Sequence, residues 1–276
     1  MAEFDAEDLE YQQLDGKPML ARRYRPRGTG PFPAVVEVHG GAWTSGDRLN
    51  NVDIATALAA DGIAVLSLEF RMPPQAAYPA VVADVNLGIR WGKAHAAELG
   101  SRPELIGGLG TSSGGHLLLL NSLRPRDPRY AALPLAGGGA VDARLPYIIA
   151  CWPVADPLAR YRAVTARGND RLVQAHHQFW PVPDAMGEGN PQLILERGEP
   201  AELPPALVLQ GTNDDNLTPD MADRFVAAYR QRGGQAQLEK FEGQPHTFIS
   251  KDPTSAASLK ALTLIKAFIH QQTGIG

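Results

Sequence analysis

Cysteine is almost absent from this chain: Cys151 is the only one among 276 residues. A single thiol cannot form an intrachain disulfide, so burial of apolar side chains has to hold the fold together. Cys151 ends an apolar stretch and no catalytic motif surrounds it. We therefore interpret it as a small core residue rather than a nucleophile.

Long hydrophobic runs are also missing. No stretch approaches the roughly 18 consecutive apolar residues that a membrane-spanning helix needs. Residues 1–10 are acidic and lack the basic and apolar regions of a secretory signal. We expect a soluble, cytoplasmic protein with no membrane partner.

Charge of one sign is scarce too. The 26 Lys and Arg against 30 Asp and Glu give a formal net charge of −4. This balance is too small and of the wrong sign to favour nucleic acid as a partner. A small neutral molecule remains the expected ligand. The sequence does not fix the oligomeric state, and a homodimer is one possibility.

Apolar runs bounded by turn residues alternate with stretches of helical period, which is typical of an α/β fold. Because the runs are rich in Val, Ile and Leu, we predict a mostly parallel, twisted sheet with helices on both faces. Residues 11–24 are expected to add antiparallel N-terminal edge strands. Predicted central strands are 33–38, 63–70, 105–109, 145–152, 206–210 and 237–241, and predicted helices are 50–60, 78–99, 219–232 and 255–272.

Residues 156–204 do not follow this alternation. The segment is too long for a plain loop in a compact domain, and long connections of this kind are often functional. We interpret it as an insertion within a single domain of residues 1–276. It is expected to act as a lid or a pocket wall.

The most informative motif is Gly110-Thr111-Ser112-Ser113-Gly114, which directly follows a predicted strand and precedes a predicted helix. This is the Gly-x-Ser-x-Gly nucleophile elbow in its strand-turn-helix setting. The glycines are required because larger residues there would collide with the adjacent strand or helix. Ser112 is therefore the candidate nucleophile.

Two phosphate-binding motifs are excluded for this glycine-rich stretch. A Walker loop needs a Lys followed by Ser or Thr after its second glycine, and none is present. A dinucleotide fingerprint beginning at Gly108 would need its third glycine where Ser113 stands. A plain Gly/Ser loop remains the alternative for the motif alone.

A nucleophilic serine needs a base, an orienting acid and donors for the developing oxyanion. His39-Gly40-Gly41-Ala42-Trp43 follows a predicted strand. The expected oxyanion donors are the N–H groups of Gly41, Ala42 and Ser113, although the His-Gly-Gly string could also be only a tight turn. Asp214 is the preferred acid, Asp215 is the fallback, and His246 after the last strand is the expected base.

The remaining histidines do not suggest a metal site. His176 and His177 are adjacent, so on a helix they point about 100° apart and cannot form an i, i+4 ligand pair. His95 and His116 are expected to have packing or surface roles. We expect no metal and no cofactor. Five residues are candidates for an aromatic-tolerant substrate pocket, with core packing as the alternative: Trp43, Trp152, His176, Phe179 and Trp180.

These motifs resemble the α/β-hydrolase superfamily, specifically its carboxylesterase branch of hormone-sensitive-lipase-like and feruloyl or acetyl esterases. The order Ser112, Asp214, His246 is the order of that fold. The resemblance extends from about residue 31 to the last predicted helix and includes Glu69-Phe70-Arg71, which is similar to the family's Asp-Tyr-Arg. Ala42 replaces the family's usual third glycine, but only its backbone N–H is needed.

The resemblance and the triad together predict a serine hydrolase. It would cleave short-chain or aromatic carboxylic esters through an acyl-enzyme intermediate. A similar His-Gly-Gly-x-Trp string occurs in kynurenine-formamidase-like hydrolases, so an arylformamidase or amidase is the alternative enzyme. A binding protein that kept the fold without catalysis is the alternative of another class.

Overall fold

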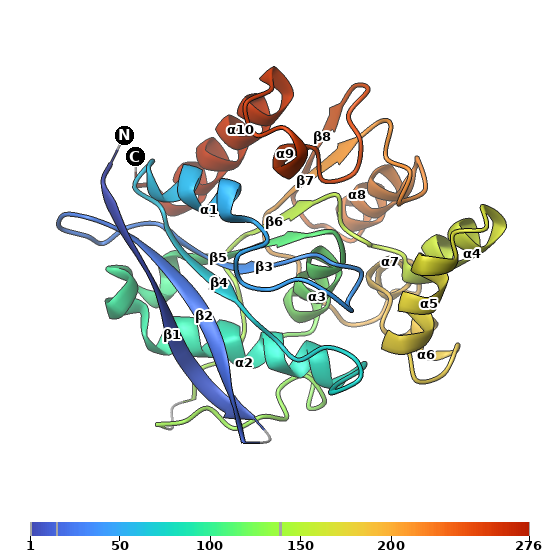
Figure 1. The fold of residues 1–276 in the computed structure, drawn as a ribbon, viewed down its shortest axis with the longest axis horizontal. Coiled ribbons are helices and arrows are strands. Elements are labelled where there is room, and N and C mark those ends of the chain that lie inside the picture. Colours follow the sequence, from blue (N-terminus) through green and yellow to red (C-terminus); the bar gives the residue numbers. More distant parts are fainter. Residues whose placement is uncertain (1, 15, 138–139, 276) are drawn as a thin grey trace.

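One 8-stranded sheet runs through the computed structural model, which describes residues 2–14, 16–137 and 140–275 (Figure 1). The strands lie in the order β1-β2-β4-β3-β5-β6-β7-β8. From β4 to β8 in this order every pair is parallel, whereas β2 pairs antiparallel with β4 and β1 pairs antiparallel with β2. The predicted sheet with antiparallel N-terminal strands is confirmed. The bounds are β1 Phe4–Leu14, β2 Lys17–Pro26, β3 Ala34–Val38, β4 Ala64–Leu68, β5 Ile106–Thr111, β6 Ile148–Cys151, β7 Ala206–Gly211 and β8 Ala236–Phe241.

The central strands are buried along their whole length. All residues of β3, β4, β6 and β7 are shielded from solvent, as expected for a parallel sheet covered on both faces. Cys151 at the end of β6 is buried and free, which confirms its interpretation as a core residue. Two buried polar residues lie in neighbouring strands, with Glu37 of β3 opposite Ser67 of β4.

Helices cover both faces of the sheet (Figure 1). On one face α2 packs against α3, and α7 (Pro191–Glu196) contacts both α3 and α8. On the other face α1 packs against α10. The predicted helices are all present, but 78–99 divides into α2 and a short 3-10 turn at Ala96–Leu99. No helix of the described ranges is long and apolar enough to cross a membrane. The bounds are α1 Val52–Ala59, α2 Ala80–Ala94, α3 Ser112–Leu123, α8 Met221–Gln231, α9 Phe248–Lys251 and α10 Ala256–Thr273.

The long segment 156–204 is largely helical. It forms α4 Pro157–Ala166, α5 Asp170–Phe179, α6 Ala185–Glu188 and α7. Three of these helices begin at a side chain that accepts a backbone N–H, which satisfies one of the free donors of the first turn. The capping residues are Asp156, Asn169 and Asn190. In Figure 1 α4, α5 and α6, in yellow, lie outside the sheet on the side of α3.

Candidate active site

Ser112 stands at the sharp turn between β5 and α3. Its φ of 53° lies in the left-handed region, which is unusual for a residue with a side chain. A Cβ atom on Gly114 would lie 2.2 Å from the carbonyl oxygens of Val38 and His39, and one on Gly110 would lie 2.8 Å from Gly114 O. The glycines are therefore required by close backbone approach, as the motif predicts.

Left-handed residues other than glycine gather around Ser112. They follow the carboxyl ends of strands: Ala42 and Trp43 after β3, Ser112 after β5, Trp152 after β6 and Thr247 after β8. Each such conformation costs on the order of 1–3 kcal/mol and persists only when its surroundings enforce it. Backbone strain is thus concentrated at the edge of the sheet formed by the carboxyl ends of its strands.

Ser112, His246 and Asp214 come together at this edge. Ser112 Oγ lies 2.8 Å from His246 Nε2, and His246 Nδ1 lies 2.7 Å from Asp214 Oδ2. Since an ionised carboxylate can only accept, the Nδ1 atom carries the proton and Nε2 is free to accept from the serine hydroxyl. All three residues are buried. The structure joins them although 134 positions separate Ser112 from His246.

Asp214, rather than its neighbour, faces His246. Its second oxygen, Oδ1, accepts hydrogen bonds from the N–H groups of Asn216 and Leu217 at 2.9 and 3.2 Å. These bonds fix the plane of the carboxylate. Asp215, the fallback choice, is exposed. The structure does not bring it into the cluster.

The turn after β3 presents backbone donors to the same space. Gly41 has a φ of 121° and Ala42 a φ of 53°. The N–H of Trp43 donates to Ser113 Oγ at 3.1 Å, so this side chain ties the turn to α3. Among the described residues, none accepts a hydrogen bond from the N–H of Gly41 or Ala42. Ser113 lies in the first turn of α3, where backbone N–H groups point outward.

A buried network of hydrogen bonds joins β3 to Thr111, the residue that precedes Ser112. Asn51 Nδ2 donates to Glu37 Oε1 and also to Thr111 Oγ1, the latter at 3.1 Å. Burial raises the pKa of Glu37 to about 7. Neither Glu37 nor Asn51 was predicted to belong to the site. The only sequence signal was a Glu inside an apolar strand, which normally excludes charge.

The prediction that five aromatic and histidine residues line the substrate pocket is wrong. Trp43, Trp152, His176, Phe179 and Trp180 are all buried and none lines the cavity at Ser112. Four of them form one packed cluster in which Trp43 stacks on Phe179 with ring centroids 4.9 Å apart. Trp152 instead packs edge-on behind His246. Aromatic rings remove the most apolar area from water when they pack in the core, so the core alternative prevails.

His116 ties this aromatic cluster to α3. Trp43 Nε1 donates to its Nδ1 at 3.1 Å, so Nε2 must carry the proton that is donated to Gly189 O at 2.8 Å. Burial lowers the pKa of His116 to about 4, which keeps the ring neutral. Of the packing or surface roles expected for His116, the structure shows the packing role.

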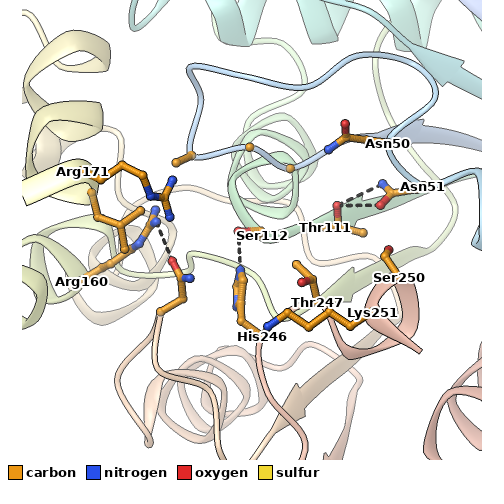
Figure 2. A pocket seen from close by; sticks show the side chains of 15 residues that line it. Asn50, Asn51, Thr111, Ser112, Arg160, Arg171, His246, Thr247, Ser250 and Lys251 are labelled. Atoms are coloured by element: carbon orange, nitrogen blue, oxygen red, sulfur yellow. Dashed lines mark hydrogen bonds between the residues drawn. The ribbon is translucent and has the colours of Figure 1, made fainter. Parts of the chain in front are cut away.

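The cavity at Ser112 has a volume of about 400 Å³. Figure 2 shows Arg160 and Arg171 on one side of Ser112, and Ser250 and Lys251 on the other. The wall is therefore polar and partly cationic rather than aromatic. The lining residues are Gly40, Gly41, Ala42, Asn50, Asn51, Thr111, Ser112, Arg160, Arg171, Leu172, Asn216, His246, Thr247, Ser250 and Lys251.

The arginines in this wall were not predicted individually. Arg160 comes from α4 and Arg171 from α5, both within the segment 156–204 that was expected to form a lid or wall. Sequence spacing alone could not show that they turn toward Ser112. Within the described ranges, no group of three His, Cys, Asp or Glu residues is placed to hold a metal ion.

Comparison with known proteins gives concordant results. The family model BD-FAE matches residues 23–154. Esterase LipC of Mycobacterium tuberculosis is 30% identical over 212 residues, covering 75% of this chain and 51% of LipC. Carboxylic ester hydrolase LipN of the same organism is 29% identical over 256 residues, covering 89% of this chain and 65% of LipN. This chain thus spans about half to two thirds of the length of these relatives.

Solved structures share the whole architecture. An esterase from Pyrobaculum calidifontis aligns with a TM-score of 0.79 at 23% identity, covering 97% of this chain and 85% of that one. At this identity the likeness establishes the fold.

Proposed function

This chain belongs to the α/β-hydrolase superfamily, in its carboxylesterase branch, and from that premise we propose that it is a serine hydrolase of small carboxylic esters. One observation carries the proposal: Ser112 Oγ, His246 Nε2 and Asp214 Oδ2 form a continuous hydrogen-bonded relay. A buried serine in a strained turn, joined to an imidazole and a carboxylate, has the arrangement of an activated nucleophile.

In the first half of the proposed reaction, Ser112 Oγ attacks the ester carbonyl carbon while its proton passes to His246 Nε2. The imidazolium is stabilised by Asp214. Collapse of the tetrahedral intermediate breaks the bond to the alcohol oxygen, and His246 returns the proton to that leaving group. Water then repeats the sequence on the acyl-enzyme, so that the acid and free Ser112 are released.

The oxyanion of each tetrahedral intermediate would be held by the N–H groups of Gly41, Ala42 and Ser113. Two of these donors have no protein acceptor within the described residues, so they are available to a substrate. Because they are fixed by the backbone, they need no reorganisation during reaction. One donor of this kind is worth roughly 3 kcal/mol of barrier.

The substrate is expected to be small. A cavity of about 400 Å³ suits short acyl or alcohol groups. The names of LipC and LipN describe ester hydrolysis, which supports esters over formamides for this chain. Aromatic esters have no specific support, because the five residues that suggested them lie in the core.

We also propose that the chain folds as a single domain in which 156–204 is a pocket wall. The site draws on residues from the turn after β3 to the end of α9, and the strands along this stretch belong to one sheet. Arg160 and Arg171 of the segment reach the cavity, which supports the wall function.

The first test is Ser112→Ala. Turnover of p-nitrophenyl butyrate should fall by on the order of 10⁶ because no nucleophile remains, while the thermal unfolding midpoint should stay close to that of the wild type. Release of p-nitrophenolate measures the activity. Turnover near the wild-type rate in a folded Ser112→Ala protein would show that Ser112 is not the nucleophile.

A fluorophosphonate provides an independent readout. It should label the wild type at one site per chain, located at Ser112 by mass spectrometry, and leave the Ser112→Ala variant unlabelled. A wild-type protein that neither reacts with the fluorophosphonate nor cleaves the ester would instead be a non-catalytic member of the fold.

A further inference from the structure

Two arginines from the pocket wall face the cavity of Ser112 without a carboxylate partner. Arg160 and Arg171 lie side by side in Figure 2, on the same side of Ser112. Within the described residues, no Asp or Glu oxygen comes within ion-pair distance of either guanidinium. Two like charges are thus held next to each other beside the reacting group.

Arg160 is the more unusual of the two. It is only 1% exposed, and it makes one side-chain hydrogen bond, from Nη2 to Asn216 Oδ1 at 3.1 Å. Its Nε and Nη1 atoms are buried without an acceptor. An unpaired charge in such a place costs several kcal/mol of desolvation, which is normally offset by an opposite charge.

The surroundings of Arg160 oppose its charge rather than support it. Burial, followed by repulsion from Arg171, lowers the pKa of Arg160 to about 10. The Trp43 ring gives a cation–π contact at 5.2 Å, but this weak interaction leaves the N–H donors unsatisfied. The Asp214 carboxylate attracts this charge, but burial and Arg171 outweigh it. Asp214 makes no ion pair with Arg160, and its oxygens accept from His246, Asn216 and Leu217.

Many arginines elsewhere in the chain have carboxylate partners. Arg27, Arg48, Arg124 and Arg129 each contact two carboxylates. The chain as a whole carries a net charge of −4. Some arginines without a carboxylate, such as the buried Arg90, donate to a backbone carbonyl instead. Arg160 donates to neither kind of acceptor, and it lies at the cavity that contains Ser112.

We propose, on the premise of the serine esterase function, that the substrate is an ester carrying a second, ionised carboxylate, which Arg160 and Arg171 bind. A planar carboxylate can accept parallel N–H bonds from a guanidinium, and Arg160 still has buried N–H donors to offer. Arg171 is exposed and would attract the anion to the mouth of the cavity. The pocket wall thereby selects charged esters over neutral ones.

The carboxylate could belong to the acyl or to the alcohol part of the ester, and matched substrates separate these sources. For the acyl part, mono-p-nitrophenyl adipate is compared with methyl p-nitrophenyl adipate. For the alcohol part, 4-(butyryloxy)benzoate is compared with its methyl ester. In at least one pair the wild type should show a kcat/KM about tenfold or more higher for the charged ester.

Variants connect this preference to the arginines. Arg171→Gln and Arg160→Gln should each reduce the ratio of charged to neutral kcat/KM by about tenfold, because each removes a charged donor. The matched control is Arg162→Gln on α4, an exposed arginine that does not line the cavity and should leave the ratio unchanged. Since Arg171 is exposed, its variant should fold even if Arg160→Gln does not.

A wild-type ratio of one or below in both pairs would overturn the carboxylate proposal while leaving ester hydrolysis in place. A high ratio that neither arginine variant lowers would overturn the assignment to Arg160 and Arg171. Absence of turnover with every ester would instead reject the proposed function. Added NaCl should lower a ratio that depends on charge, and a ratio that did not respond to salt would count against an ionic contact.

Discussion

The Asp214 carboxylate illustrates how closely single residues are specified at this site. One oxygen faces His246 Nδ1 and the other accepts two backbone N–H groups of its own loop. Asp215, one position further, is exposed and its backbone oxygen accepts from Arg167. Two neighbouring residues of identical chemistry thus occupy opposite environments. A local turn decides which of them can orient the imidazole.

This contrast provides a matched pair of variants. Asp214→Asn should lower kcat on p-nitrophenyl butyrate by on the order of 10⁴, because an amide can donate to Nδ1 and hold the ring in the wrong tautomer. Asp215→Asn should change kcat less than about twofold and serves as the control. Equal effects of the two substitutions would contradict the assignment of Asp214.

The junction between β5 and α3 shows how one element positions another. The backbone at Gly114 lies against the carbonyl oxygens at the end of β3, and Gly110 lies against the first turn of α3. Ser113 Oγ then holds the Trp43 N–H of the neighbouring turn. Strand, elbow and oxyanion turn are therefore held by backbone contact.

Glycines with and without a close backbone neighbour should respond differently to substitution by alanine. Gly114→Ala would place a Cβ 2.2 Å from two carbonyl oxygens, so the free energy of unfolding should fall by about 1–3 kcal/mol or more. Gly187→Ala is the control, because its Cβ would be 3.6 Å from the nearest atom, the end of the Arg197 side chain. Urea unfolding measures both. Similar stability of the two variants would contradict the close packing of the elbow.

The sheet that runs through the whole molecule has a carboxyl group buried at its centre. Glu37 lies on β3 between β4 and β5, and Asn51 joins it to Thr111 beside Ser112. The pKa of Glu37 is raised to about 7 because burial penalises the charged form. Folding therefore favours the protonated carboxyl. The stability of the chain is linked to pH through a residue that solvent does not reach.

The sign of this linkage follows from the direction of the shift. The Glu37 pKa is higher in the folded chain than the ordinary value of 4.5, so its favourable contribution is complete below about pH 4.5. That contribution declines as pH rises to about 7 and is then constant. Glu37→Gln should remove this decline. Relative to the wild type, the variant should gain up to about 3 kcal/mol between pH 5 and pH 8.

Urea unfolding of the wild type and Glu37→Gln at several pH values measures the difference. A control variant, Glu239→Gln, changes a Glu on β8 at the edge of the same sheet and should run parallel to the wild type. If the Glu37→Gln and wild-type curves ran parallel from pH 5 to pH 8, Glu37 would not be the titrating group.

Local signals in the sequence account for much of the fold. Apolar runs located the central strands, and helical periods located α1, α2, α8 and α10. The helices of 156–204 were not predicted individually, although Asp156 and Asn190, each followed by proline, stand at starts of helices there. Two of them, α6 and α7, span only 4 and 6 residues, so they contain too few turns for a repeating apolar period to stand out.

The sequence by itself determined the order of Ser112, Asp214 and His246 and the sheet that contains them, because these depend on local motifs and short-range pattern. Only the tertiary structure decided which side chains reach the cavity. Trp43, Trp152, His176, Phe179 and Trp180 lie in the core, because packing there removes the large apolar surface of their rings from water. Arg160 and Arg171 face Ser112 instead, because long-range packing of α4 and α5 sets their direction.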